Sequence, residues 1–224
     1  QKVREGRYDD IVPCIGCNEC LYASHQGKDH SCAVNPQCLR EMDYPLTDVS
    51  EKKSLLVIGG GPGGMETAIT AAKRGINVEL WEKEDELGGN LRTAGAPRFK
   101  QDVMDYRNYL VNQVTKLAIK VRLGYEANVE TVKAGKFDKV VLASGSTPFI
   151  PPITGVDGRN VREAMEVLLG REDVGKRVVV IGGGLVGCEV ALHLNETSEK
   201  VTIVEMMDDI LATVQHCQNN DEEL

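Results

Sequence analysis

A glycine pattern that occurs twice constrains the fold of this 224-residue chain more than any other feature of its sequence. Both copies read G-x-G-x-x-G, and their glycines are Gly59, Gly61 and Gly64, then Gly182, Gly184 and Gly187. Each copy follows a short apolar run, typical of a buried parallel strand, and precedes a helical pattern. Such glycines permit a tight turn, a close backbone approach and close packing of helix on strand. The repeat therefore predicts an α/β fold with two Rossmann-like units.

The residues around each glycine pattern predict the elements of the two units. In the first we expect strands near 55–58, 77–82, 119–123 and 137–143, and helices over 62–74 and 99–118. The second should repeat strand, helix and strand over 177–181, 185–195 and 200–205. Apolar residues from Phe99 to Leu117 recur at helical spacings, which predicts an amphipathic helix. Three prolines and two glycines in 148–158 indicate a connection between domains.

A glutamate ends the second strand of each unit and makes both units candidate dinucleotide sites. Glu82 and Glu205 stand at the same position relative to their glycines, where a carboxylate can accept from ribose hydroxyls. Each helix would direct free N–H groups and its positive dipole end toward the phosphates. Met206 and Met207 follow Glu205, and no lysine or arginine is there to pair with a 2′-phosphate. We therefore expect NADH rather than NADPH; a turn without a ligand is the alternative for each copy.

Four cysteines precede the first unit in the spacing C-x2-C-x2-C-x11-C. They are Cys14, Cys17, Cys20 and Cys32. Zinc sites usually present two separated Cys-x2-Cys pairs, whereas cubane clusters prefer a run of three cysteines and a later fourth. The spacing predicts a [4Fe–4S] cluster, with zinc or ordinary thiols as the alternatives. His25 and His30 should be solvated loop residues. Residues 1–50 carry little apolar material, so we expect a metal to hold them.

Composition and the remaining cysteines limit the possible partners of the chain and the cellular environment in which it works. The net charge of −8, without a basic block, argues against a nucleic-acid partner. No apolar run approaches the ~20 residues of a membrane helix, and the first residues are no signal peptide. Cys38, Cys188 and Cys217 should be plain thiols, with Cys188 buried, which suits a reducing, cytoplasmic setting. We expect the chain to be a fragment of a longer polypeptide and its polar C-terminal tail to be frayed. The sequence leaves open whether the protein forms a homo-oligomer.

Five stretches of the sequence occur together in one known enzyme family. They are Asp10-Ile-Val-Pro-Cys14-Ile-Gly-Cys17-Asn-Glu-Cys20, Val57-Ile-Gly-Gly-Gly-Pro-Gly-Gly-Met-Glu66, Leu87-Gly-Gly-Asn90, Ala143-Ser-Gly145 and Val180-Ile-Gly-Gly-Gly-Leu-Val-Gly-Cys-Glu189. Through them nearly the whole chain resembles the C-terminal half of NADH:flavin oxidoreductases that include 2,4-dienoyl-CoA reductase, 2-enoate reductase and trimethylamine dehydrogenase. The cysteine spacing is more similar to that of the amine dehydrogenases than to that of the dienoyl reductase.

The resemblance implies cofactors and the residues that hold them. In such proteins a TIM barrel with FMN precedes the cluster segment, and an FAD domain interrupted by an NAD(P) domain follows. The four cysteines would be the cluster ligands. Residues implied at FAD are Gly59, Gly61, Gly63, Gly64, Glu82, Lys83, Gly89 and Asn90. Residues implied at NADH are Gly182, Gly184, Gly187 and Glu205. Ala143, Ser144 and Gly145 match the segment where the chain crosses from the FAD to the NAD domain.

The resemblance also implies domains and an activity. We expect a cluster-binding segment at 1–50, the first part of an FAD-binding Rossmann domain at 51–150 and an incomplete NAD-binding Rossmann domain at 151–224. The chain would be the reductase portion of an NADH-dependent iron–sulfur flavoprotein. Hydride would pass from NADH to FAD, and single electrons through the cluster to FMN on an absent barrel, for reduction of an activated C=C bond of an enoate or enoyl-CoA. The chain offers no acid–base catalyst.

Two alternatives to this activity stay open. The first is an amine dehydrogenase of the trimethylamine dehydrogenase type, in which the first nucleotide site holds a structural ADP. The second is a nucleotide-binding module without turnover of its own.

Overall fold

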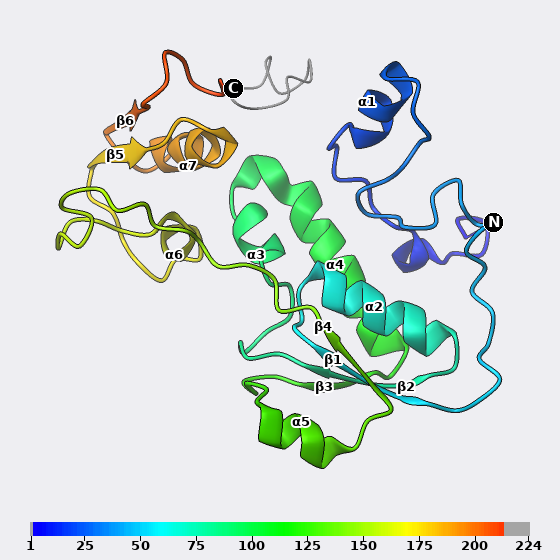
Figure 1. Ribbon diagram of the computed structural model, residues 1–224. Helices are drawn as coiled ribbons and strands as arrows, with labels where there is room; N and C mark the ends of the chain where they lie inside the picture. Colours follow the sequence, from blue (N-terminus) through cyan, green and yellow to red (C-terminus); the bar gives the residue numbers. More distant parts are fainter. Residues whose placement is uncertain (1, 213–224) are drawn as a thin grey trace. The chain divides into compact units, whose positions relative to one another are not determined.

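The computed structural model describes residues 2–212 and separates into two compact units, each built around its own parallel sheet. The first unit comprises Gln1–Ala94 with Asp102–Thr147, and the second comprises Gly95–Gln101 with Pro148–Leu224. Figure 1 follows the chain through both units. Cys217 and the expected polar tail lie outside the described residues.

The first unit is built on a four-stranded parallel sheet with the strand order β3-β2-β1-β4. Its strands are β1 (Ser54–Ile58), β2 (Asn77–Trp81), β3 (Lys120–Arg122) and β4 (Lys139–Leu142). Leu56 in the centre of β1 pairs with Glu79 of β2 and with Val140 of β4. The predicted strands are thus present within one or two residues, and β1, whose Leu56 and Val57 are fully buried, is the centre of the unit.

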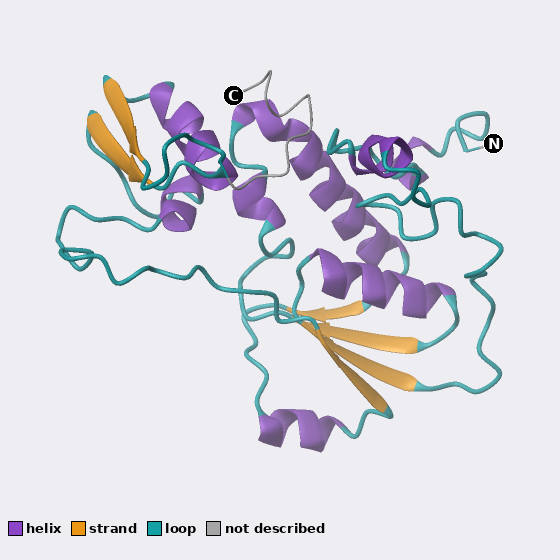
Figure 2. Cartoon of the chain, turned by 45° about the horizontal axis from the view of Figure 1, so that its top comes forward, coloured by secondary structure: helices purple, strands orange, loops and turns teal. Residues whose placement is uncertain are grey.

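Two helices cover one face of this sheet, and a short one lies on the other side. Figures 1 and 2 both show α2 (Pro62–Lys73) and α4 (Gln101–Lys116) on the first face and α5 (Val129–Gly135) opposite. Residues buried between sheet and helices are Val57, Met65, Ile69, Leu80, Leu110 and Val114. Leu110 and Val114 belong to the predicted apolar stripe of α4 and are buried as expected.

The long helix is present, but it begins two residues later than expected. Phe99 lies in the 3-10 turn η2 (Arg98–Lys100), its side chain is 52% exposed, and α4 begins only at Gln101. Pro97 precedes that turn in extended conformation, so the chain cannot carry the helix back through this point. Sequence periodicity also missed four short helices, α1 (Glu19–His25), α3 (Leu91–Ala94), α5 (Val129–Gly135) and α6 (Ala164–Leu168). A helix of one or two turns shows too little repetition to be recognised.

The second unit repeats the β–α–β order of the first on a smaller scale. β5 (Arg177–Ile181) pairs in parallel with β6 (Lys200–Val204), and α7 (Leu185–Asn195) packs against both strands. Cys188 of α7 is buried, as predicted. Within residues 2–212, every helix is too short or too polar to cross a bilayer.

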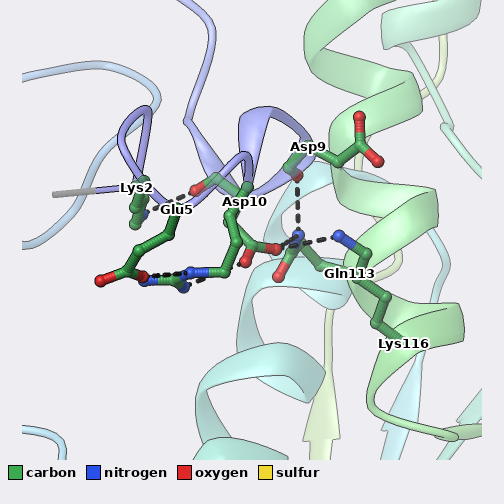
Figure 3. A network of polar contacts seen from close by, with 7 residues as sticks. Lys2, Glu5, Asp9, Asp10, Gln113 and Lys116 are labelled. Carbon is green, nitrogen blue, oxygen red and sulfur yellow. Dashed lines mark hydrogen bonds and ion pairs between the residues drawn. The ribbon is translucent and has the colours of Figure 1, made fainter.

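The cysteine-bearing segment is held to α4 by apolar and polar contacts. Val34 is buried in the core of the first unit, and Val12 and Ile15 pack against that core. Gln113 of α4 donates to the main-chain oxygen of Asp9 at 3.1 Å, and the Lys116 ammonium lies 3.0 Å from the Asp10 carboxylate (Figure 3). A few apolar side chains of the segment thus reach a core built by other elements. That a metal also holds the segment stays a prediction.

Candidate functional site

The first glycine turn joins β1 to α2 at the carboxyl end of the sheet. Gly59 has φ 109°, a backbone conformation that residues other than glycine rarely adopt. Its N–H donates to the Trp81 main-chain oxygen at 2.8 Å. A Cβ on Gly59 would overlap the Ala143 carbonyl, and a Cβ on Gly64 would overlap the Gly59 carbonyl. Glycine at these two positions is therefore required by the turn and by the packing of α2 on β1.

Gly61 and Gly63 have no such structural reason to be glycine. A Cβ on Gly61 would meet nothing closer than 3.9 Å, and one on Gly63 nothing within 4 Å. Gly61 is extended, at φ −73° and ψ −177°, and is the N-cap of α2 without a capping side chain. The first-turn N–H groups of a helix have no partner within the helix. This open, uncapped helix end fits a phosphate, which gains from N–H donors and from the helix dipole.

The carboxylate of Glu82 closes the same turn from the end of β2. Glu82 is 7% exposed; one oxygen accepts from Gly60 N–H at 2.5 Å and the other from Glu84 N–H at 2.9 Å. These bonds hold the carboxylate beside the glycine turn, where the sequence pattern predicts a ribose. The neighbouring Lys83 is exposed to solvent.

The second glycine turn reproduces this geometry. Gly182 has φ 106° and donates to the Val204 oxygen at 2.9 Å, and a Cβ on Gly187 would overlap the Gly182 carbonyl. Gly184 is again extended, caps α7 without a side-chain bond, and would have nothing within 4 Å of an added Cβ. In both units, therefore, an open glycine is the N-cap of a helix that has no capping side chain.

Glu205 occupies the place that Glu82 has in the first unit. Its carboxylate accepts from Gly183 N–H at 2.6 Å and from the N–H groups of Met206 and Met207 at 2.7 and 2.8 Å. The hydrogen bonds from Met207, Gly183 and Met206 hold the pKa of Glu205 below its ordinary value. The side chain is therefore an anion at neutral pH.

Arg107, which the sequence reasoning missed, anchors a loop beside the first turn. Gly88 N–H donates to the Gly60 oxygen at 2.9 Å. On the far side of the loop, Arg107 donates to the Leu87 oxygen from Nε at 2.9 Å and from Nη2 at 2.6 Å. Nη2 also contacts the Glu86 carboxylate at 2.7 Å. An arginine on an amphipathic helix looks like any solvated residue, so no sequence signal marks it.

The other residues implied at the first site lie around this loop and behind the turn. Gly89 and Asn90 are exposed, and a Cβ on Gly89 would lie 2.9 Å from the Gly61 Cα. Ala143 N–H donates to the Ile58 oxygen at 2.8 Å, which places Ala143 directly behind Gly59. Ser144 is exposed and Gly145 has φ 69°. The role of each at a cofactor stays a prediction.

The four predicted cluster ligands are free thiols on the segment that packs on α4. Cys14, Cys17 and Cys20 are exposed and Cys32 is half-buried. The Gly16 N–H points to the Cys14 sulfur at 3.4 Å. Thiolates are the right donors for an iron–sulfur cluster, but across residues 2–212 the structure gathers no three metal-ligating side chains around one point. The cluster therefore stays a prediction from spacing.

Comparison with known proteins assigns the family. Residues 53–220, three quarters of the chain, match the family model described as pyridine nucleotide-disulphide oxidoreductase. The chain belongs to this family. The expected α/β fold with Rossmann-like units is thereby confirmed.

Individual relatives confirm the narrower resemblance as well. The chain is 43% identical to cinnamate reductase of Clostridium sporogenes over 94% of its length and 31% of that protein. It is 44% identical to NADH oxidase of Thermoanaerobacter brockii over 94% of its length and 33% of that protein. The structure of 2-naphthoyl-CoA reductase matches with a TM-score of 0.90 and 36% identity, over 96% of this chain and 33% of that one. The chain spans about a third of the length of these relatives.

Proposed function

We propose that the chain is the reductase portion of an NADH-dependent iron–sulfur flavoprotein, with FAD on the first glycine turn and NADH on the second. The observation that carries the proposal is the pair of open glycines, Gly61 and Gly184. Each begins a helix without a capping side chain and lies in a turn whose packing does not need it to be glycine. An approaching pyrophosphate gives both positions a reason to be glycine.

The groups on this chain bind and orient, and the bound cofactors bring the redox chemistry. The chemistry supplied on binding is hydride transfer from NADH to FAD, followed by one-electron transfer through a [4Fe–4S] cluster to FMN on a separate barrel domain. Gly61 and Gly184 would let pyrophosphates approach the two helix ends. Glu82 and Glu205 would receive ribose hydroxyls, and Cys14, Cys17, Cys20 and Cys32 would hold the cluster.

The preference for NADH follows from Glu205. Its carboxylate is kept ionised by three backbone N–H groups, and residues 206–212 bring no lysine or arginine to offset it. A 2′-phosphate at the same ribose would place two anions together, which raises the free energy of the bound state. The second unit should therefore discriminate against NADPH.

The proposed substrate of the longer protein is an enoate or an enoyl thioester. Two relatives carry cinnamate and 2-naphthoyl-CoA in their names, and both compounds place a C=C bond beside a carbonyl. Hydride adds to such a bond because the carbonyl accepts the charge that develops. Substrate reduction itself is assigned to the barrel.

An anaerobic absorbance spectrum of the chain, before and after addition of NADH, tests the proposal. Flavin bands together with a broad cluster absorbance, both bleached by NADH, are expected. A longer parent protein that contains FMN and a cluster but no FAD, and that does not respond to NADH, would contradict the proposal and favour an amine dehydrogenase with structural ADP. A chain that binds FAD and NADH but whose flavin bands are not bleached would favour a nucleotide-binding module without turnover.

A further inference from the structure

The two nucleotide turns are alike in more than their glycines. In each unit, the loop after the glutamate is hydrogen-bonded to the residue that follows the first glycine of the turn, Gly60 or Gly183. Gly88 N–H donates to the Gly60 oxygen at 2.9 Å, and Leu211 N–H donates to the Gly183 oxygen at 2.8 Å. Neither the turn, the glutamate nor this bond can therefore explain why one unit would take a flavin nucleotide and the other would not.

The two loops differ in the residues at that shared bond. In the first unit they are Gly88 and Gly89. Gly88, at φ 134°, needs glycine for its backbone conformation, and Gly89, at φ 51°, needs it because a Cβ there would lie 2.9 Å from the Gly61 Cα. In the second unit the donor is Leu211, a buried side chain at φ 58°. A bare glycine backbone thus lies beside the first turn, and a leucine side chain lies beside the second.

Arg107 fills the space that a side chain at Gly88 would take. A Cβ on Gly88 would lie 3.0 Å from Arg107 Nε and 2.9 Å from Arg92 Cγ. Both arginine side chains are only 16% exposed, and both form ion pairs with the Glu86 carboxylate. Arg92 Nη2 lies 2.5 Å from one of its oxygens. The loop is therefore fixed from two sides, by the Gly60 oxygen and by the Arg107 fork on the Leu87 oxygen.

This anchoring determines where Gly89 and Asn90 stand. Gly89 packs so closely on Gly61 that a Cβ on Gly89 would come within 2.9 Å of the Gly61 Cα. Gly61 is the uncapped start of α2, the place proposed for the pyrophosphate. The loop thus lies beside the proposed place of the pyrophosphate, which ADP and FAD both carry. Only FAD continues past the pyrophosphate, so only FAD can make further contacts with the loop.

We infer that Arg107 is a positioning residue that acts through the 86–90 loop to let the first turn accept FAD, and that its effect on FAD binding is larger than its effect on ADP binding. The inference rests on the proposed function. Arg107 has its polar contacts at Glu86, Leu87 and Asn108, away from Glu82 and the Gly59–Gly64 turn. A loss of Arg107 should release the loop and weaken most the interactions that a ligand makes beyond its pyrophosphate.

Separate titrations of the chain with FAD and with ADP test this inference. FAD binding is followed by flavin fluorescence, and ADP binding by the emission of Trp81, the single tryptophan, which directly precedes Glu82. For Arg107→Met we expect the Kd of FAD to rise about tenfold or more and the Kd of ADP to change less than about twofold. Arg107→Lys should fall between, because an ammonium cannot present the planar fork.

Lys116→Met is the matched control, since Lys116 lies on the same helix and makes an ion pair remote from the loop. It should leave the affinities for FAD and ADP as in the wild type. Equal losses for both ligands in Arg107→Met, with a lowered Tm, would show a merely structural role and overturn the inference. Unchanged FAD affinity in that variant, beside a wild type that binds FAD, overturns it too and leaves the proposed function standing. A wild-type chain that takes no FAD overturns the proposed function itself.

Discussion

Single glycines in the two turns have different reasons to be glycine, and the structure gives the contacts behind each reason. Gly64 and Gly187 would each drive a Cβ into the carbonyl of the first glycine of their turn. Gly61 and Gly184 meet open space and adopt a backbone conformation that any residue can take. The sequence pattern predicts these separate roles, and the contacts agree with it: two positions serve packing and two leave room for an approaching ligand.

Gly61→Ala should therefore weaken FAD binding and leave the fold intact. The added methyl stands where the pyrophosphate approaches, so we expect the Kd of FAD to rise about tenfold. The free energy of unfolding should change by about 1 kcal/mol or less, the cost of alanine at an N-cap. Flavin fluorescence and thermal unfolding measure the two effects. Gly64→Ala is the contrast: it should cost about 1–3 kcal/mol through overpacking. If Gly61→Ala bound FAD as tightly as the wild type does, the pyrophosphate of FAD could not lie at this position.

Glu205→Gln should reduce the preference for NADH over NADPH. The carboxylate is ionised at neutral pH, and its amide replacement removes the charge that repels a 2′-phosphate. We expect the ratio of the NADPH and NADH dissociation constants to fall about tenfold, measured by nucleotide fluorescence. Glu199→Gln, which removes a carboxylate paired with Lys176 in the same unit, should leave the ratio unchanged. An unaltered ratio in Glu205→Gln would show that other groups select the nucleotide.

At the scale of elements, the strand–turn–helix units were predicted well and the N-terminal segment was not. β5 and α7 have the predicted bounds, because apolar runs, glycine turns and helical spacing are local signals. The segment before β1 packs through Val34 on a core that α2 and α4 build far away in sequence. Its polar anchor on α4 also joins residues about one hundred positions apart, which no periodicity reveals.

The polar anchor makes the packing of this segment dependent on pH. Hydrogen bonds from Lys116, then Gln113 and Arg7, lower the pKa of Asp10 to about 2. A carboxyl with a lowered folded-state pKa stabilises the fold above its ordinary pKa and loses that contribution as the pH falls through the folded value. We expect the segment to loosen between about pH 4 and pH 2, and Asp10→Asn to loosen it at pH 7. Hydrogen exchange of residues 8–34 against β1 measures this.

Asp9→Asn is the control for that experiment, since Asp9 contacts Gln113 through its main-chain oxygen alone. It should exchange like the wild type. If Asp10→Asn also exchanged like the wild type, the ion pair with Lys116 would contribute nothing to holding the segment.

At the scale of the molecule, the chain consists of two units, and it enters the second one twice. Residues 95–101 group with the second unit although they lie between α3 and α4 of the chain. Lys100 there forms an ion pair with Glu189 of α7 at 2.5 Å, and Arg98 lies 4.0 Å from Glu196. The sequence indicated only the later passage, at the prolines after residue 147.

Two units that bind different ligands should respond to them separately. We expect FAD to raise the unfolding temperature of the first unit and NADH that of the second, since a ligand stabilises the native state that binds it. Trp81 fluorescence follows the first unit alone, and calorimetry follows both. In Gly61→Ala only the response to FAD should shrink. A single transition shifted equally by either ligand would show that the units unfold together.

The sequence by itself determined the two Rossmann-like units, their glycine turns, both glutamates and the family resemblance. These features depend on neighbours along the chain or on spacings within one βαβ unit, so residue order suffices to recognise them. Only the tertiary structure decided that Arg107 anchors the 86–90 loop and that the N-terminal segment rests on α4. Each of these depends on atoms that folding brings together from distant positions, and residue order does not encode such a contact as a local pattern.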